Sequence, residues 1–428
     1  MLTITRGNYI YMNNMLREVQ KRKPLEGLRV LELGQLLAGP FAGVLLAWFG
    51  AEVIKVEQPA IGDPLRNWRA MHKGTALWWY ILGRNKKSIT LDLRHPIGQE
   101  IVRKLVTHMD VLLENFKPGT MEKWGLGYED LRKLNPKLIM ARVSGWGQTG
   151  PNARKPGFAS VAEGVGGLRY VTGYPDRPPA RPNLSLGDSL AGLHAALGVM
   201  IALYYRDIVG ARTGQVVDIA IYESVFNMME GIVPEYDMCG IIREREGTKL
   251  SGIVPTGTYP CKGGEYIIIG GNSDSIFKRL MTAIGRSDMT NDTRLEHNDG
   301  RVKHEQEIED AITAWTLEHT FEDALKILED ADVPSGPIYS VVEMLKDPHF
   351  IARSLFETVT LEDGCTVKLP RMVPQMSETP GGTEWVGPPL GAHNREVLQG
   401  ILGVSEAELE KFVAEGVIGD CAVTSKEE

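Results

Sequence analysis

One acidic residue stands where a long helix is expected to begin. Gly187-Asp188-Ser189 leads into residues 189–205, a mostly apolar stretch that predicts a long, buried helix. Asp188 fits two interpretations. It can cap the helix, because aspartate is favoured at helix N-termini. It can also be a carboxylate presented beside a glycine that lets a ligand approach, and such a carboxylate can act as a covalent nucleophile that the helix dipole keeps ionised.

Positive charge is concentrated in residues 66–94. This segment holds seven basic residues and one acidic residue, Asp92, in a chain whose formal net charge is −8. Two interpretations fit: a solvated face, or a site where lysine and arginine neutralise the phosphates of a ligand. The aromatic residues between them either stack on a base or fill the core. The basic residues are Arg66, Arg69, Lys73, Arg84, Lys86, Lys87 and Arg94, and the aromatic residues are Trp68, Trp78, Trp79 and Tyr80.

The sequence lacks the motifs that mark several common classes of enzyme and binding site. The turn at residues 34–40 does not have the G-x-G-x-x-G spacing of a dinucleotide site, and the chain has no Walker A motif and no G-x-S-x-G. The four cysteines form no C-x-x-C and the nine histidines form no H-E-x-x-H, so no metal site is expected. The net charge of −8 argues against a nucleic-acid partner. Because the cysteines are dispersed along the chain, we expect a reducing compartment and therefore the cytoplasm. If the chain is eukaryotic, the mitochondrial matrix is the alternative location.

The elements that must position these residues begin with a βαβ unit. Residues 29–33 and 52–57 have strand character, and a helix is expected at 41–49, after Gly39-Pro40. The nineteen residues 33–51 carry no charge and approach the length of a membrane span. Pro40 would break a spanning helix there. We therefore expect a strand end, a turn and a buried helix, and no membrane partner.

Strands and helices continue to alternate up to about residue 221. This pattern predicts an α/β protein with an open, doubly wound, Rossmann-like parallel sheet. Further strands are expected at 111–114, 138–143 and 216–221, and helices at 96–109, 128–134 and 189–205.

The pattern changes after about residue 225. Residues 258–269 predict a β-hairpin, and helices are expected at about 274–284, 304–318 and 321–331, which together indicate a second, smaller α+β domain. Asp363-Gly364 marks another hairpin. Ser405 and Glu408 have the spacing of a capping box for a C-terminal helix.

A series of short motifs covers nearly the whole chain from Pro24 onward. In order, they are residues 24–40, 50–57, 62–63, 84–89, 114–119, 125–128 and 145–151, followed by Gly187-Asp188. With these motifs the chain resembles the class III coenzyme A transferases, the CaiB/BaiF-like family that includes formyl-CoA transferase and the carnitine CoA-transferases. The resemblance overturns the capping interpretation of Asp188.

The resemblance implies a mechanism and a set of site residues. Asp188 attacks a donor acyl-CoA to give an anhydride, which the CoA thiolate converts into an aspartyl-CoA thioester that passes CoA to an acceptor acid. The backbone N–H of Ala38 helps to hold the reacting carbonyl. The CoA thioester is a substrate, and no permanently bound cofactor and no metal is implied. By the same resemblance, CoA-contacting positions are Gln58, Leu91, Arg94, Asn115, Phe116, Lys117 and Lys123.

The resemblance also narrows the substrates. Residues 62–69 and 77–80 look most like the succinyl-CoA-dependent branch, whose acceptors are malate, citramalate, itaconate or similar dicarboxylates. Leu37 and the shortened segment 270–273 depart from the formyl-CoA branch, which argues against oxalate and formate. One of Arg66, Arg69 and Arg169 is a candidate to pair with the distal carboxylate of a dicarboxylate.

The alternative within this family is an acyl-CoA racemase or isomerase. The racemases need a histidine shortly after the motif at 145–151, where this chain has Phe158. They also need an acidic residue in the small domain, where this chain has Asn272. Two missing acid–base groups favour CoA transfer.

The resemblance also implies an interlocked homodimer, in which each chain threads through the ring that the other chain forms. This resemblance implies a discontinuous large domain. The expected parts are an N-terminal extension at 1–23, a large Rossmann-like CoA-binding domain at 24–225 plus 336–428, and a small domain at 226–335.

Overall fold

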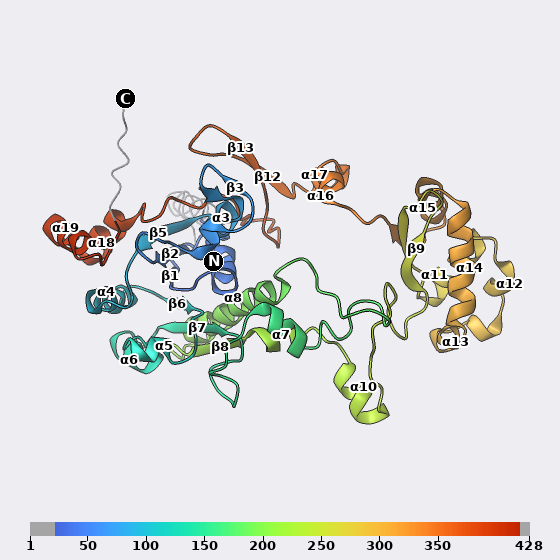
Figure 1. Ribbon diagram of the computed structural model, residues 1–428, viewed down its shortest axis with the longest axis horizontal. Helices are drawn as coiled ribbons and strands as arrows, with labels where there is room; N and C mark the ends of the chain where they lie inside the picture. The colour runs from blue at the N-terminus through green and yellow to red at the C-terminus, as the bar shows by residue number, and fades with distance from the viewer. Residues whose placement is uncertain (1–21, 420–428) are drawn as a thin grey trace, which may run out of the picture. The chain divides into compact units, whose positions relative to one another are not determined.

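The chain, described here from a computed structural model that covers residues 22–419, divides into two units (Figure 1). The first unit holds the residues up to Gly166, Asn183–Met228 and the residues from Ser354 onward, and the second holds Gly167–Pro182 and Met229–Arg353. The second unit thus differs from the expected small domain at 226–335, since it ends later and includes an earlier segment. The expected extension at 1–23 lies almost wholly outside the described residues.

A six-stranded parallel sheet forms the centre of the first unit. Its order is β5-β2-β1-β6-β7-β8, and every neighbouring pair is parallel. This order confirms the doubly wound α/β class predicted from the sequence. The strands are β1 (Arg29–Glu32), β2 (Glu52–Glu57), β5 (Lys86–Thr90), β6 (Val111–Glu114), β7 (Ile139–Ser144) and β8 (Val216–Ala220).

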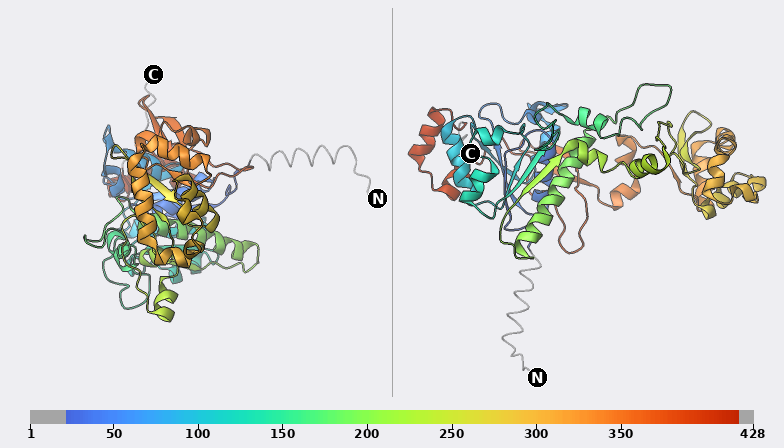
Figure 2. Two further views of the ribbon diagram at one scale, coloured as in Figure 1. Left: turned by 90° about the vertical axis from the view of Figure 1, so that its right-hand side faces the viewer. Right: turned by 90° about the horizontal axis from the view of Figure 1, so that it is seen from below.

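Helices cover both faces of this sheet (Figure 2). Successive strand residues point to opposite faces, so Val30 and Leu31 of β1 belong to two separate apolar clusters. The cluster that contains Val30 includes residues of α2 (Ala38–Trp48), α7 (Ala159–Val165) and α8 (Leu186–Asp207). The cluster that contains Leu31 includes residues of α4 (Pro96–Val106), α5 (Thr120–Lys123), α6 (Tyr128–Leu134), α18 (Asn394–Leu402) and α19 (Glu406–Ala414).

The first helix begins earlier than the sequence predicts. It starts at Ala38 instead of residue 41, with Pro40 inside its first turn. Proline is tolerated there because the first-turn N–H groups have no acceptor within the helix. All residues of α2 except Phe41 are buried, so the uncharged run at 33–51 forms a strand end, a turn and a core helix.

Helix α8 is long and apolar, but it is only partly buried. The sequence predicts a buried helix, whereas 44% of its most apolar window is buried. Its inner side packs on the sheet and on α2, and its outer side exposes Leu197 and Ile201, at 56% and 60%. Among the described residues it is the one helix long and apolar enough to cross a membrane, a test that core helices of soluble proteins also pass.

The C-terminal segment returns to the first unit. Asn394 accepts a hydrogen bond from the Thr90 N–H at 2.7 Å and donates one to the Thr90 hydroxyl at 2.8 Å, which ties α18 to β5. The expected hairpin around Asp363 and the capping box of Ser405 are both confirmed. The remaining elements of this unit are η1 (Pro64–Asn67), β3 (Met71–His72), β4 (Thr75–Ala76), α3 (Leu77–Leu82), α9 (Ile221–Phe226), β12 (Phe356–Thr360) and β13 (Thr366–Pro370).

The second unit is a small α+β domain around a three-stranded antiparallel sheet of order β11-β10-β9. The expected hairpin and three helices are confirmed. Gly173 joins the earlier segment to this unit, because its carbonyl accepts the Gly247 N–H at 2.9 Å. The elements are α10 (Ile232–Cys239), β9 (Thr256–Pro260), β10 (Tyr266–Gly270), α11 (Asp274–Ala283), α12 (Ser287–Thr290), η2 (Thr293–Leu295), α13 (Asn298–Lys303), α14 (Glu305–Glu318), α15 (Phe321–Asp330), β11 (Ser335–Gly336), α16 (Val341–Met344) and α17 (Pro348–Ala352).

Candidate active site

The carboxyl ends of the parallel strands define one edge of the sheet. From β1 the chain runs to β2 and β5 on one side and later returns to β6, β7 and β8 on the other. The strand order therefore reverses between β1 and β6, and ligands of open α/β sheets bind at this switch point. Residues 34–38 follow β1, Gln58 follows β2, Leu91 and Arg94 follow β5, and residues 115–117 follow β6. The topology thus brings these predicted site residues to one edge.

Asn115 bridges the two strands at the switch point. Its Oδ1 accepts the Gln35 N–H at 2.8 Å, and its Nδ2 donates to the Gln35 carbonyl at 2.8 Å. Both polar atoms of the side chain are therefore engaged with the loop that follows β1. The CoA contact that the resemblance implies for Asn115 stays a prediction, and in this structure the amide holds the loop in place.

Two further side chains hold the same loop. Lys55 donates to the Gly34 carbonyl at 2.8 Å, and Asp63 accepts the Leu36 N–H at 3.1 Å. Leu36 has φ = 62°, in the left-handed region that a leucine rarely adopts. These bonds hold the strained loop in the conformation that leads into α2.

Beneath the loop lies a buried cluster of charges. Lys55 pairs with Asp63 at 2.8 Å and with Glu32 at 3.1 Å, and Lys86 pairs with Glu32 at 2.7 Å. All four side chains are at most 1% exposed. Burial opposes charge on both lysines, but neighbouring carboxylates raise the pKa of Lys55 above its usual value. Burial lowers the pKa of Lys86 to about 8, and the positive charge of Lys55 contributes to this shift.

The N-terminus of α2 presents backbone donors at this edge. The first N–H groups of a helix have no acceptor within it, and Pro40 has no N–H at all. Ala38 is 2% exposed and is the first residue of the helix. Its N–H and the positive end of the helix dipole suit a carbonyl oxygen that gains negative charge during a reaction.

Asp188 lies in the first turn of α8 and is half-buried. Gly187 beside it donates its N–H to the buried Glu163 at 3.4 Å, and a Cβ on Gly187 would lie 3.2 Å from Ile221. Gly192 follows one turn later, on the same face as Asp188. A Cβ on Gly192 would lie 2.6 Å from the carbonyl oxygen of Ala38. The close approach at Gly192 therefore sets the first turn of α8 beside the start of α2.

The other predicted CoA-contacting residues differ in exposure. Leu91 is 1% exposed and belongs to the core, so its side chain offers almost no surface to a ligand. Phe116 packs edge-to-face on Trp124 with ring centroids 5.2 Å apart. Gln58 is half-buried. Exposed cations at this edge are Arg94, Lys117 and Lys123.

The basic segment at 66–94 is mostly structural, which corrects the expectation of a phosphate-binding cluster. Arg66 binds both oxygens of Glu57 at 2.7 Å, and Arg84 donates to the Pro370 carbonyl at 2.9 Å. Lys86 is buried against Glu32, as described above. A cation taken out of water needs such partners, and net charge along the sequence cannot reveal them. Lys87 pairs with Glu52 and Glu396, Lys73 pairs with Asp363, and Arg69 stacks on Trp78.

A polar cavity of about 430 Å³ opens between the segments that follow β6 and β7. Arg142 lies on its wall and pairs with Glu114 at 2.7 Å and with Glu122 at 2.6 Å. Burial raises the pKa of Glu114 to about 6 although Arg142 opposes this shift. The lining residues are Pro118, Gly119, Glu122, Arg142, Gln148, Thr149, Gly150, Pro151, Ala153 and Arg154.

Fold and site together define an α/β protein with an acidic residue and a helix N-terminus at its ligand-binding edge. The model of CoA-transferase family III matches residues 25–394. The chain belongs to this family and is a CoA-transferase.

Curated relatives match over almost their full length. A succinyl-CoA–D-citramalate CoA-transferase of Chloroflexus aurantiacus is 52% identical over 92% of this chain and 98% of its own length. The alpha subunit of a succinyl-CoA–L-malate CoA-transferase of the same species is 40% identical over 93% of this chain and 94% of its own length. The crystal structure of a CaiB/BaiF family protein from Brucella suis superposes with a TM-score of 0.77 at 33% identity, over 89% of this chain and 100% of that one.

Sequence reasoning missed the residues that support the site. Lys55, Asp63 and Glu163 act through the backbone of Gly34, Leu36 and Gly187, and no motif spacing marks such contacts. Gly62-Asp63 was recognised only as part of a family motif. The racemase alternative gains nothing from the fold, since Phe158 is 71% exposed and carries no acid–base group.

Proposed function

We propose that this CoA-transferase moves CoA from succinyl-CoA to a dicarboxylic acid through a covalent thioester on Asp188. The observation that carries the proposal is that Asp188 lies in the first turn of α8, one turn before Gly192, whose backbone closely approaches Ala38 at the start of α2. The named activities of the two Chloroflexus relatives support the donor and the class of acceptor.

The proposed reaction needs four balanced steps. The Asp188 carboxylate attacks the thioester carbonyl of succinyl-CoA, the C–S bond breaks, and a succinyl-aspartyl anhydride and CoA thiolate form. The thiolate attacks the aspartyl carbonyl, which releases succinate and leaves aspartyl-CoA. The acceptor carboxylate then attacks the aspartyl-CoA thioester. The C–S bond breaks, so that CoA thiolate leaves and an anhydride of the acceptor with Asp188 forms. Attack of the thiolate on the acceptor carbonyl gives the product and restores Asp188.

The surroundings of Asp188 suit these steps. Each attack places negative charge on a carbonyl oxygen, and the N–H of Ala38 stabilises that charge without reorganisation. Gly187 lets the first turn of α8 pack closely on Ile221, which fixes the helix turn that carries Asp188. Exchange between two thioesters is nearly balanced in energy, so no nucleotide triphosphate is required.

Binding of CoA and of the acceptor is assigned to exposed cations. Arg94, Lys117 and Lys123 are the proposed partners of the CoA phosphates, since most cations of 66–94 are occupied by carboxylates or carbonyls. Arg66 is bound to Glu57, which leaves Arg69, in the same unit as Asp188, as the candidate for the second carboxylate of the acceptor.

A steady-state assay tests the proposal. Succinyl-CoA is offered with citramalate, malate, itaconate, oxalate or formate, and new CoA esters are identified by mass spectrometry. We expect product with at least one of the three larger dicarboxylates and a loss of about 10³-fold or more in Asp188→Asn. Asp207→Asn, at the other end of the same helix, is the matched control. Full activity of Asp188→Asn would reject the nucleophile, and α-proton exchange without transfer would favour the racemase.

A homodimer is part of the proposal. The outer side of α8 exposes Leu193, Leu197, Ile201 and Tyr204, and Ile208 directly after the helix is exposed as well, each by more than half of its surface. A continuous apolar stripe of this kind is uncommon on an isolated soluble chain. The interlocked dimers implied by the resemblance would cover it with a second copy.

A further inference from the structure

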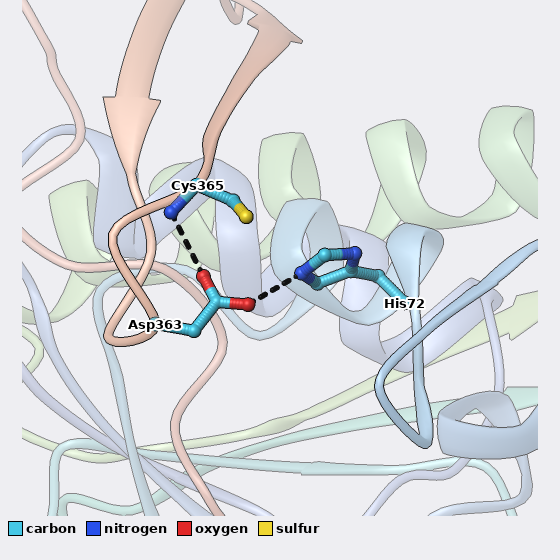
Figure 3. A group of neighbouring side chains, drawn as sticks. All are labelled: His72, Asp363 and Cys365. Atoms are coloured by element: carbon cyan, nitrogen blue, oxygen red, sulfur yellow. Dashed lines mark hydrogen bonds and ion pairs between the residues drawn. The ribbon is translucent and has the colours of Figure 1, made fainter.

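Two hairpin turns of the first unit meet at a group of side chains outside the site described above (Figure 3). His72 comes from the β3–β4 hairpin, and Asp363 and Cys365 come from the turn between β12 and β13. His72 and Asp363 are 291 positions apart in the sequence. Such a separation explains why no motif with short metal-ligand spacing marks this group.

The three side chains offer three different donor atoms to one point. His72 Nε2 lies 2.7 Å from Asp363 Oδ2, and the Cys365 N–H donates to Asp363 Oδ1 at 3.0 Å. The imidazole nitrogen, the carboxylate oxygen and the thiol sulfur all lie within 4.8 Å of one another. The backbone bond from Cys365 holds the Asp363 carboxylate in place between the two turns.

We propose that His72, Asp363 and Cys365 bind a thiophilic divalent cation of the Zn²⁺ type. Nitrogen, oxygen and sulfur ligands are the set that Zn²⁺ takes in proteins. Its bonds of about 2.0–2.3 Å place ligand atoms of one tetrahedral site roughly 3.5 Å apart, so modest side-chain rotations complete the site. Three protein ligands leave the fourth position to water.

The cation reaches the group from solvent. Side-chain exposure is 30% for His72 and 21% for Asp363, and Cys365 is exposed. On binding, the proton that Nε2 shares with Asp363 leaves to solvent and Nδ1 takes one up, so that the neutral imidazole donates the Nε2 lone pair to the cation. Asp363 remains a carboxylate, and the Cys365 thiol releases one proton to solvent as the metal–sulfur bond forms. No oxidant or reductant takes part in this step.

Lys73 is a built-in competitor for the cation. Its ammonium lies 2.9 Å from Asp363 Oδ2, and its side chain is 66% exposed. The cation must displace this ammonium, which then moves freely into solvent. The competition predicts that removing the lysine strengthens metal binding, a result that a merely structural salt bridge would not give.

The bound cation would join the β3–β4 hairpin to the β12–β13 hairpin. The first hairpin follows η1 directly, and η1 begins after Asp63, which holds the loop before α2. A cross-link between the hairpins therefore stabilises the first unit near its active-site support. A stabilising role needs no change in the chemistry at Asp188.

The test uses the full-length protein after treatment with a chelator. Zn²⁺ binding is measured by calorimetry, and Co²⁺ is used as a spectroscopic probe, because a cobalt–thiolate bond gives a charge-transfer band in the near ultraviolet. We expect one site per chain with this band, and a higher thermal unfolding midpoint with Zn²⁺. Cys365→Ser and His72→Ala should abolish the band or weaken binding by about tenfold or more.

Two controls sharpen the result. Cys239→Ser removes an exposed cysteine elsewhere and should leave the band unchanged. Lys73→Ala should tighten Zn²⁺ binding severalfold. Absence of a thiolate band in the wild type, equal binding by wild type and Cys365→Ser, or no effect of Lys73→Ala would each overturn the proposal.

Discussion

Four charged side chains, Glu32, Lys55, Asp63 and Lys86, are buried beneath the loop that leads into α2. Lys55 is their centre, because it neutralises two carboxylates and also donates to the Gly34 carbonyl. At the scale of single residues, the site therefore rests on a side chain that meets no substrate.

Lys55→Met tests this support. In this variant the buried carboxylates of Asp63 and Glu32 lose the positive charge that neutralises them. We therefore expect the substitution to lower the free energy of unfolding by about 3–5 kcal/mol. Denaturant titration measures the change. Lys133→Met breaks an exposed pair with Asp130 and should have no measurable effect. A loss below about 1 kcal/mol for Lys55→Met would show that the cluster does not hold the fold.

His393 supplies a pH dependence. Its Nδ1 accepts the Ser88 N–H at 3.1 Å, and burial lowers the pKa of this imidazole below its usual 6.5, with Lys87 adding to the shift and Glu396 opposing it. The native state therefore binds fewer protons than the unfolded state just below that pH, so protonation costs stability as the pH falls through this range.

The comparison with His393→Asn isolates this contribution. Asparagine offers an oxygen acceptor to Ser88 and does not titrate. Unfolding free energies are measured in steps from about pH 8 to about pH 5. We expect the wild type to lose stability relative to the variant as the pH falls. A difference that is independent of pH would remove His393 as the cause.

Single residues show what a sequence can and cannot predict about the site. The sequence placed Asp188 correctly at the start of its helix, because a short signature, Gly187-Asp188-Ser189, precedes the apolar run. The prediction that the basic segment 66–94 binds phosphate is wrong for Arg84 and Lys86. Both side chains are buried against partners that lie far away in the sequence, and a local count of charges cannot reveal such partners. The predicted contact of Asn115 with CoA stays a prediction, and its hydrogen bonds to Gln35 across the switch point could not be predicted from a local pattern.

At the scale of elements, the approach of α8 to α2 sets the geometry of the site. Gly192 permits this approach, because any larger residue would place a Cβ 2.6 Å from the Ala38 carbonyl and 2.9 Å from the Phe41 Cβ. Backbone atoms are involved, so the helices themselves must move apart when a side chain is added.

Gly192→Ala is therefore expected to displace Asp188 from the start of α2. We predict that kcat falls by about tenfold or more. Gly400→Ala is the control, because a Cβ at this position of α18 meets nothing within 4 Å. Steady-state kinetics with succinyl-CoA compares the two variants. Equal kcat values would show that the contact does not position Asp188.

Element types were easier to predict than their bounds. Periodicity and turn residues identified five of the six strands of the sheet and the hairpin at 258–269, which depend on local sequence, but they did not identify β5. The start of α2 at Ala38 was missed because Pro40 looks like a boundary. The membership of Gly167–Pro182 in the second unit rests on contacts such as Gly173 with Gly247, which no local pattern encodes.

At the scale of the whole molecule, the exposed side of α8 predicts self-association. We expect the wild type to be a dimer by light scattering, and Leu197→Glu with Ile201→Glu to shift it toward monomer, because charges would enter an apolar interface. Leu134→Glu, on exposed α6, is the control and should leave the dimer intact. A monomeric wild type would contradict the prediction, and binding to lipid vesicles would assign the face to a membrane instead.

In the proposed reaction Asp188 carries CoA as a thioester. Peptide mass spectrometry after incubation with succinyl-CoA, without an acceptor, detects this intermediate. We predict that the peptide containing Asp188 gains the mass of CoA less one water, and that hydroxylamine converts this adduct to a hydroxamate at the same residue. An unmodified Asp188 peptide from enzyme that still transfers CoA would contradict the account.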